Sequence, residues 1–426
     1  MPNITLKVKL NVDTEDIEFL KQNCGAKRYV YNWGLGIQLD LYQKYKDFME
    51  KHPDWEHHDY PYDIKLSYNQ LANKLTNLKA ENLWLYNCES TSLQNALKDL
   101  DTAYKNFFSS LKGTRKGRKV GFPKFKKKGK SKNSFRINAN NTKNIQIHNN
   151  QIKLPKLSWV TVANGAKQLH RFDHLNPKIK SVTISEDNRK WFASILLEVE
   201  SIPVRFKYTN MSAGLDLGLK DFITLNNGNK FNIPKRLYNL QKRLKKLHKS
   251  FSIKLKLAKE QGKDLNNCKN LQKAKAKLSE CYYKIRCIRE DFQNKLSTNI
   301  VKNIDVLTIE TLNIQGMMKN RRLSNKISLQ GWYSFVAKLK YKYQWEHRIL
   351  IEVDKFFPSS KLCNVCHTKN TNLTLKDREW TCNSCNTTHD RDVNAANVLN
   401  NVSQHFATTG EALLIAKQYE KAFAVV

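Results

Sequence analysis

Four cysteines in the last quarter of the sequence have the spacing of a metal site. They form two Cys-x-x-Cys pairs, Cys363 with Cys366 and Cys382 with Cys385, and fifteen residues separate the pairs. Each pair turns two sulfurs toward one point, and the chain between them can bring the second pair round to complete a tetrahedron. Four thiolates favour zinc over Mg²⁺ or Ca²⁺, which prefer oxygen. The spacing predicts a zinc ribbon with one structural Zn²⁺; a redox dithiol or chance clustering is the alternative.

Three carboxylates in the second half of the chain could hold catalytic metals. Asp216 lies in a run that is otherwise apolar or glycine, Glu310 ends the apolar segment 304–310, and Asp392 opens a helical pattern through residues 394–398. Strands that end in acids place their side chains along one edge of a sheet. We predict that these three acids bind two Mg²⁺ ions about 3.5–4 Å apart, one activating a water to attack phosphorus and the other stabilising the departing oxygen.

Each acid taken alone has a simpler interpretation, as a helix N-cap, a turn residue or the end of a surface strand. We accept that interpretation for Asp221, Asp305 and Asp390. For Asp216 it is harder to accept, because an isolated buried carboxylate costs several kcal/mol unless it is hydrogen-bonded or binds a cation.

Composition limits the class of protein. The chain has 426 residues, more than one core usually organises, and a formal net charge of +36. Such a charge predicts a polyanionic partner, either nucleic acid or a membrane surface. No run approaches the length of a spanning helix, and the first residues lack the apolar segment of a signal peptide. Five further cysteines are scattered among helical patterns, so we expect a cytoplasmic, nucleic-acid-binding protein without disulfides.

The first half of the chain predicts a small β-barrel interrupted by helices. Residues 4–10 alternate apolar and basic side chains, as in a half-buried strand. A mainly helical block follows to about residue 111, broken by a loop at 51–63. Five short strands between residues 145 and 198 suggest the barrel, which the first strand could close.

A basic segment, residues 112–132, separates the helical block from those strands. It contains eleven Lys or Arg and no acid, with Phe122, Pro123 and Phe125 among them. A solvated linker is the usual interpretation of such a charge run. The aromatic residues favour a partly ordered loop that binds phosphates in a salt-sensitive, sequence-independent way. The candidate contacts are Lys119, Lys124, Lys126 and Lys127.

The elements of the second half must position the acids. The pattern predicts a strand, a tight turn and a second strand over residues 211–225, then a hairpin turn at Asn227 and Gly228. Two long basic helical stretches follow with a break near Gly262, which predicts an antiparallel helical hairpin. The near-continuous apolar segment 304–310 suits a central strand covered on both faces.

Several motifs together resemble the TnpB family, transposon-encoded proteins related to the type V CRISPR effectors. The resemblance covers most of the chain but is weak over the first 110 residues. It rests on Gly214-Leu-Asp216-Leu-Gly218, the strand ending at Glu310, Phe357-Pro-Ser-Ser360, Asp390-Arg-Asp392-x-Asn-Ala-Ala396, the loop Gly121-Phe-Pro-Lys-Phe125 and the lysine-rich helical hairpin.

The resemblance implies an RNA-guided DNA endonuclease with a multidomain α+β architecture. An oligonucleotide-binding wedge barrel would comprise residues 1–12 and 112–207, with a helical recognition domain at 13–111 inserted. A RuvC-like RNase H fold would comprise residues 208–360, including the hairpin 235–298, and resume at 388–410 after a zinc ribbon at 361–387. Residues 411–426 form a tail without an assigned role.

The resemblance also implies partners and roles. Asp216, Glu310 and Asp392 would be the catalytic acids, and Asp390 the less favoured of the last two aspartates. Arg391 would contact the scissile phosphate. A guide RNA transcribed from the transposon end would pair with double-stranded target DNA, and the protein would act at the prokaryotic nucleoid. The oligomeric state stays open, with a monomer as the default expectation.

Three hypotheses follow. The first is RNA-guided, Mg²⁺-dependent cleavage of DNA beside a short flanking motif. The second is an RNA-guided repressor that binds DNA without cutting, which the intact set of acids disfavours. The third is an accessory transposition enzyme that acts on element ends without RNA.

Overall fold

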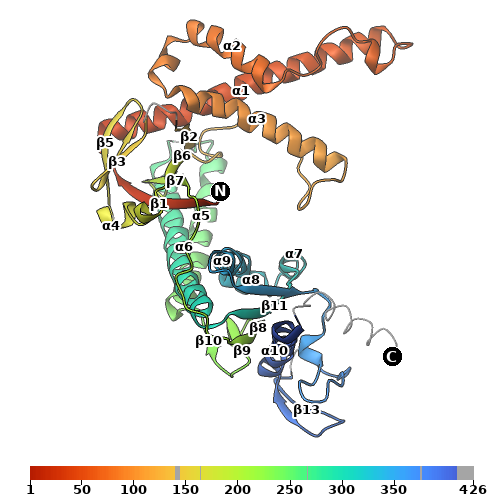
Figure 1. Ribbon diagram of the computed structural model, residues 1–426. Helices are drawn as coiled ribbons and strands as arrows, with labels where there is room; N and C mark the ends of the chain where they lie inside the picture. Colours follow the sequence, from red (N-terminus) through yellow and green to blue (C-terminus); the bar gives the residue numbers. More distant parts are fainter. Residues whose placement is uncertain (140–143, 164, 266, 375–376, 410–426) are drawn as a thin grey trace. The chain divides into compact units, whose positions relative to one another are not determined.

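The computed structural model describes residues 1–139, 144–163, 165–265, 267–374 and 377–409 (Figure 1). The chain divides into two compact units, Met1–Ile202 and Pro203–Val426, and the division lies close to the expected boundary at residue 208. Each unit has hydrophobic cores of its own. None of the helices in these ranges combines the length and apolar character that crossing a bilayer requires.

The first unit contains one antiparallel seven-stranded sheet, in which the N-terminal strand β1 (Asn3–Asn11) lies between β7 and β5. Its residues Ile4, Leu6, Val8 and Leu10 are buried, as the alternating pattern predicts. Strand β2 was not among the predicted strands, although its Phe135 and Ile137 alternate with polar residues and are buried. In the part of the chain that the structure describes, no pairing joins the edge strands β2 and β3, so a closed barrel is not observed. The other strands in spatial order are β2 (Ser134–Asn138), β6 (Lys178–Asp187), β7 (Lys190–Glu198), β5 (Leu157–Val162), β4 (Gln151–Leu154) and β3 (Gln146–His148).

Three helices form the inserted block, with a separate hydrophobic core. They are α1 (Thr14–Lys51), α2 (Tyr68–Glu81) and α3 (Ser90–Leu111), with the short helical turns η1 (His57–Asp59) and η2 (Leu83–Asn87) between them. Two further short helices, α4 (Ala166–Leu169) and η3 (Asp173–Leu175), lie outside this block, between strands β5 and β6. Asp13 caps α1 through a 2.8 Å hydrogen bond from the backbone N–H of Asp16. The predicted loop at 51–63 is confirmed, since η1 is its principal regular element.

The second unit contains a mixed five-stranded sheet. The strands β8, β11 and β12 are parallel, while β9 and β10 run antiparallel to their neighbours. The predicted hairpin turn joins β9 to β10, with Gly228 at a φ of 82° that favours glycine. The order across the sheet is β10 (Lys230–Phe231), β9 (Ile223–Leu225), β8 (Ser212–Leu217), β11 (Val306–Glu310) and β12 (Ile349–Val353).

Helices cover both faces of this sheet. Leu215 of β8 and Leu307 of β11 enter a core with Ile300 of α6 and Phe335 of α9. On the other face, α10 packs Leu399 against Val353 of β12 in a separate cluster. The helices are α5 (Lys235–Glu260) and α6 (Lys269–Asn303), which form the predicted hairpin, then α7 (Ile314–Met318), α8 (Ser324–Gln330), α9 (Trp332–Trp345), η4 (Ser359–Lys361) and α10 (Arg391–Thr409). Two short strands, β13 (Glu379–Thr381) and β14 (Thr388–Asp390), pair just before α10.

The helix α10 lies directly against the backbone of β8. A Cβ atom added to Gly214 would be 1.9 Å from the carbonyl oxygen of Ala396 and 2.4 Å from the backbone nitrogen of Asn400. The hydroxyl of Ser403 donates to the carbonyl of Ala213 at 3.0 Å and lies 2.7 Å from the hydroxyl of Thr308. Glycine at residue 214 therefore fixes how closely the last helix approaches the sheet.

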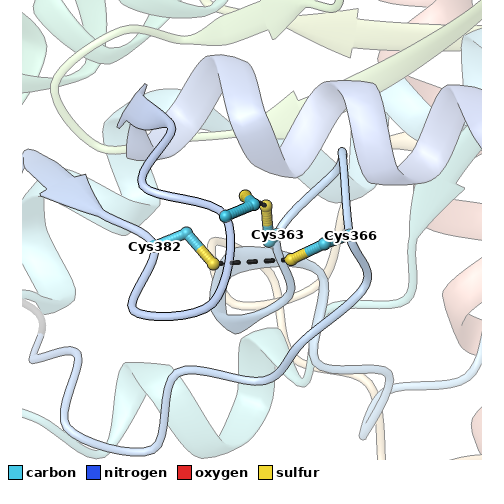
Figure 2. Close-up of side chains that lie close together, drawn as sticks. Cys363, Cys366 and Cys382 are labelled. Carbon is cyan, nitrogen blue, oxygen red and sulfur yellow. Dashed lines mark hydrogen bonds between the residues drawn. The ribbon is translucent and has the colours of Figure 1, made fainter.

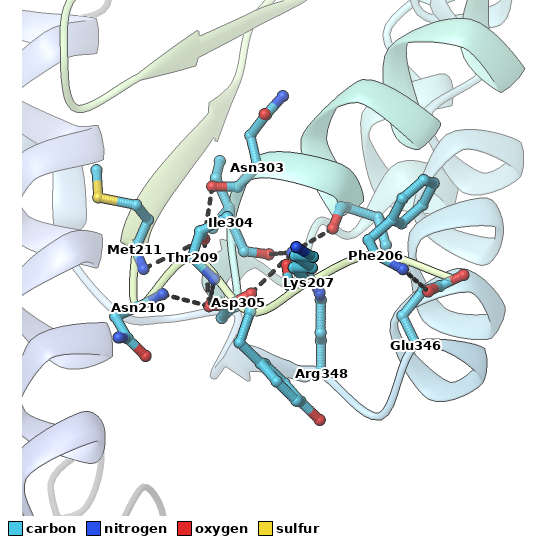
Figure 3. A network of polar contacts seen from close by, with 12 residues as sticks. Phe206, Lys207, Thr209, Asn210, Met211, Asn303, Ile304, Asp305, Glu346 and Arg348 are labelled. Carbon is cyan, nitrogen blue, oxygen red and sulfur yellow. Dashed lines mark hydrogen bonds and ion pairs between the residues drawn. The ribbon is translucent and has the colours of Figure 1, made fainter. Parts of the chain in front are cut away.

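A polar network fixes the opposite ends of the parallel strands (Figure 3). The carboxylate of Asp305 accepts hydrogen bonds from the backbone N–H groups of Thr209 and Asn210, both at 2.6 Å, and pairs with Arg348 at 2.8 Å. The same guanidinium donates to the carbonyl of Lys207 at 2.7 Å. Because these residues precede β8 and β11 and lie far along the strands from Asp216 and Glu310, Asp305 has a structural role.

Candidate active site and metal centre

Strand pairing brings Asp216 and Glu310 side by side. Leu215 of β8 is opposite Ile309 of β11, so the next residue of each parallel strand is an acid. Since Leu215 and Ile309 enter the core, alternation along the strands turns both acids toward the face that α10 covers. Asp392 lies in the first turn of α10. All three acids line one cleft of about 560 Å³.

The environment of the cleft disfavours the ionisation of Asp216 and Glu310. Burial, with repulsion from Glu310 and then Asp392, raises the pKa of Asp216 well above its usual value, and Arg391 only partly opposes this. Burial also raises the pKa of Glu310, against the effect of a hydrogen bond from Ser359. Carboxylates crowded in this way favour the binding of cations, which remove the repulsion.

Two arginines hold the carboxylate of Asp392. Arg391 places Nε at 3.1 Å and Nη2 at 2.9 Å from Oδ1, and Arg378 places Nη1 at 3.3 Å from Oδ2. Arg391 also donates from Nη1 to the carbonyl of Asp377 at 3.1 Å. Both guanidiniums line the cleft together with the three acids.

The oxygens of the three acids do not form a ready metal cage. Among the described His, Cys, Asp and Glu side chains, the group whose ligand atoms converge closely enough for one ion is the four cysteines. The carboxylate of Asp392 is paired with two guanidiniums, and Glu310 accepts a hydrogen bond from Ser359, so both acids already have partners in this structure.

Asp390 has a different environment from Asp392. Its Oδ1 accepts from the backbone N–H groups of Asp392 at 3.0 Å and Val393 at 3.1 Å, as an N-cap does. Its Oδ2 pairs with Lys230 at 2.6 Å. The hydrogen bonds and the lysine lower the pKa of Asp390 despite its partial burial. This aspartate caps α10, which agrees with assigning the catalytic role to Asp392.

The four cysteines converge as their spacing predicts (Figure 2). Their sulfurs all lie within 4.8 Å of one another, with Cys363 at 3.6 Å from Cys385 and Cys366 at 3.5 Å from Cys382. Four converging sulfurs from two knuckles fit a tetrahedral zinc.

The two knuckles have the same local geometry. In each, the backbone N–H of the first cysteine donates to a threonine carbonyl five residues on, Thr368 or Thr387, at 3.0 and 2.9 Å. The residue after the second cysteine, His367 or Asn386, has a φ of 58° or 59°. The hydroxyl of Thr368 lowers the pKa of Cys366 to about 6, whereas burial raises the pKa of Cys363 to about 12.

The cysteine cluster is tied to the helix that carries Asp392. The side chain of Asn394 donates to the carbonyl of Leu362 at 2.6 Å and accepts from the backbone N–H of Asn364 at 3.0 Å. The backbone N–H of Arg391 donates to the carbonyl of Arg378 at 2.7 Å. The first knuckle therefore helps to position the first turns of α10.

The basic loop of the first unit is anchored to α1. The side-chain amide of Asn32 donates to the carbonyl of Lys126 at 2.9 Å and accepts from its N–H at 2.8 Å. The ammonium of Lys126 lies 3.5 Å from the centroid of the Tyr31 ring, and burial lowers its pKa to about 8. In contrast, Lys119, Lys124 and Lys127 are exposed. Of the four lysines predicted to bind phosphates, Lys126 is the one that holds the loop against α1.

Sequence reasoning missed two residues that contact the acids. Ser359 donates to Oε1 of Glu310, and Arg378 pairs with Asp392. Ser359 belongs to the Phe-Pro-Ser-Ser motif that carried the resemblance, so a signal was present. Arg378 lies between the two cysteine pairs, and its approach to the acids depends on the folded ribbon.

Three family descriptions match parts of the chain. Residues 332–399 match "Cas12f1-like, TNB domain", residues 194–321 match "Probable transposase", and residues 1–47 match "Helix-turn-helix domain". In this structure residues 14–47 belong to one continuous helix, α1, that follows strand β1.

Whole-chain comparisons agree with these matches. A "Putative RNA-guided DNA endonuclease" of Streptomyces pristinaespiralis is 33% identical over 336 residues, which are 78% of this chain and 76% of that protein. The "Putative RNA-guided DNA endonuclease InsQ" of Escherichia coli K12 is 29% identical over 88% of this chain and 86% of its own. The fold is similar to that in a Cas12f1–sgRNA–target DNA complex, with a TM-score of 0.50 and 14% identity over 91% of this chain and 83% of that chain. The chain therefore belongs to the TnpB family of transposon-encoded proteins.

Proposed function

We propose that this protein is the RNA-guided DNA endonuclease of a transposable element and cuts target DNA by metal-dependent hydrolysis. The observation that carries the proposal is the alignment of Asp216 and Glu310 on adjacent parallel strands, in one cleft with Asp392. Burial and mutual repulsion raise the pKa of Asp216 there, which is the environment of a functional carboxylate cluster.

The acids have the chemistry of a magnesium site. Once Asp392 leaves its arginine partners, the three carboxylates offer the hard oxygen ligands that Mg²⁺ prefers. Two bound Mg²⁺ ions would supply an activated water and stabilise the leaving oxygen. Arg391 and Arg378 line the same cleft and, once released from Asp392, would bind the scissile phosphate.

The sheet of the second unit supports a RuvC-like RNase H fold. In its strand order β10-β9-β8-β11-β12, the first three strands are antiparallel, and β11 and β12 are added parallel to β8. Asp216 lies near the end of β8, and Glu310 is the last residue of β11. The four cysteines would hold one structural Zn²⁺ as a ribbon inserted before the last acid. In the first unit, the seven-stranded sheet would serve as the wedge, with α1 to α3 as the recognition domain.

The partners follow from charge and family. The net charge of +36 suits a protein that holds both a guide RNA and its DNA target, and the exposed lysines 119, 124 and 127 would bind phosphates. The guide RNA would derive from the transposon end, and the protein would act at the bacterial nucleoid.

Purification of the protein with its bound RNA tests the proposal. The RNA is sequenced, and a duplex that matches it is incubated with the complex with and without Mg²⁺. We expect cleavage only with RNA, matching target and Mg²⁺ together, and none by Asp216→Ala, which still binds DNA. Binding without cleavage by the unaltered protein would instead support a repressor, and cutting of element ends without RNA would support an accessory transposition enzyme.

A further inference from the structure

A second cavity opens beside the cleft of the acids. It has a volume of about 250 Å³ and lies between the end of β11 and helix α9. Leu217, Glu310 and Trp332 line both this cavity and the cleft of the acids. A polymeric ligand that lies across the acids can therefore place a neighbouring group in this cavity.

The walls of this cavity are apolar and aromatic. Leu312, Ile314 and Val336 contribute half-buried apolar side chains to it. Tyr333 lies at its edge with 81% of its surface exposed. Within the described ranges the Tyr333 side chain has no hydrogen bond and no ring contact, so one face of the phenol is available to a ligand.

The charged groups of this cavity exclude a phosphate as its ligand. Glu310 and Glu352 both line it, and its lysine, Lys340, is already paired with Glu352 at 2.7 Å. An anion would meet two carboxylates and no free cation. A flat, neutral group with polar edges is the ligand that fits an aromatic wall beside these charged side chains.

We propose that this cavity binds one unpaired base of the DNA strand being cut, stacked on Tyr333, and thereby positions the next phosphate at the acids. The inference rests on the proposed nuclease function. One base would occupy this cavity while its neighbouring phosphate lies in the cleft of the acids, so the strand would enter the cleft single-stranded. Because every base has a π-face, such stacking tolerates any sequence.

Abasic substrates test this proposal. A single abasic nucleotide is moved through the positions that flank the cut in a single-stranded target, and cleavage by the RNA complex is timed. We expect one position at which the abasic nucleotide slows cutting by about 5- to 150-fold, the range that loss of base–aromatic stacking gives. Tyr333→Ala should slow cutting of the intact strand to a similar degree and add no further loss with the abasic strand.

Matched variants separate stacking from a general loss of structure. Tyr333→Phe and Tyr333→Trp keep a ring and should restore both the rate and the sensitivity to the abasic position. Tyr238→Ala removes a partly exposed tyrosine on α5 away from this cavity and should leave both unchanged. Equal sensitivity to the abasic nucleotide in Tyr333→Ala and the unaltered protein would overturn the inference.

A binding measurement keeps the inference separate from the function proposal. In the Asp216→Ala complex, a 2-aminopurine at the critical position should lose fluorescence on stacking, and Tyr333→Ala should restore the fluorescence. If the unaltered protein cuts no DNA, the proposed function fails. The fluorescence measurement still decides whether the cavity holds a base. Cleavage without any fluorescence change would overturn the cavity's role alone.

Discussion

Gly214 and Ala396 meet backbone to backbone, because the carbonyl oxygen of Ala396 occupies the space in which a side chain at residue 214 would begin. This contact sets the distance between β8, which carries Asp216, and α10, which carries Asp392. A glycine two residues before Asp216 therefore controls the geometry of the acids.

Substitution of Gly214 by Ala should displace α10. The added methyl group overlaps backbone atoms that cannot rotate away, so we expect a loss of about 1–3 kcal/mol in stability and a loss of cleavage. Thermal unfolding and cleavage assays measure both. Gly25→Ala is the matched control, since an added Cβ there meets no atom within 4 Å and lies inside helix α1, where alanine is favoured. Normal cleavage by Gly214→Ala would contradict the role of this contact.

Removal of the charge of Asp216 should stabilise the metal-free protein. Folding raises the pKa of Asp216, so the folded state holds this proton more tightly than the unfolded state does. The protonated side chain therefore stabilises the fold fully below about pH 4, the pKa in the unfolded chain, and this stabilisation is lost as the pH rises through the pKa in the folded protein. At neutral pH without divalent cations, Asp216→Asn should melt higher, by about 2–4 °C for each kcal/mol of repulsion relieved. Mg²⁺ should stabilise the unaltered protein and narrow this difference. A lower melting temperature for the variant would contradict the raised pKa.

Arg391→Ala should have opposite effects on metal binding and on catalysis. Asp392 loses a competing cation, so less Mg²⁺ should be needed for half-maximal cleavage. The maximal rate should fall by about 10²-fold or more if the guanidinium stabilises charge on the scissile phosphate. Titration of Mg²⁺ against the cleavage rate separates the two effects. Cutting at the normal rate would rule out a role for Arg391 at the phosphate.

Loss of the zinc site should impair cutting more than RNA binding. Cys363→Ser removes one ligand from the knuckle that Asn394 ties to α10, so Asp392 loses part of its support. We expect about one zinc per chain in the unaltered protein by elemental analysis, less in the variant, and a marked loss of cleavage with little change in RNA affinity. Cys287→Ser, on α6 and outside the cluster, is the control and should keep both metal and activity.

The exposed lysines of the basic loop should contribute to RNA affinity through salt-dependent contacts. Lys124→Ala and Lys127→Ala should each reduce the slope of log affinity against log salt by about one if each lysine neutralises one phosphate. Lys126→Ala should differ, because its ammonium lies over Tyr31 and its loss loosens the loop. Filter binding across a salt series distinguishes these cases. An unchanged slope for the two exposed lysines would identify the loop as a solvated linker.

The sequence reveals features whose determinants are local. Paired cysteines predict the convergence of their sulfurs, because each Cys-x-x-Cys turn holds its own geometry. Acids that end apolar segments predict a shared edge, because parallel strands align their ends. Both predictions use only the residues near each cysteine pair or each acid, and neither needs to know which other segment of the chain packs against it.

Other features depend on which segments meet. The strand β2 has only five residues, two of them apolar, and its pairing with β6 along its whole length stabilises it. The capture of Asp392 by Arg378 and Arg391 depends on the folded ribbon, and the cavity beside Tyr333 depends on how α9 packs near β11. The crowding of Ala396 on Gly214 likewise needs residues 182 positions apart in the sequence to be in contact.

The place of Asp392 at the start of α10 has a consequence for synthesis. The ribosome completes the first unit of the polypeptide, and then Asp216 and Glu310, before it makes this helix, and domains fold as they emerge. The three acids can therefore come together only after translation has passed the four cysteines and the start of α10, when the first unit is already complete.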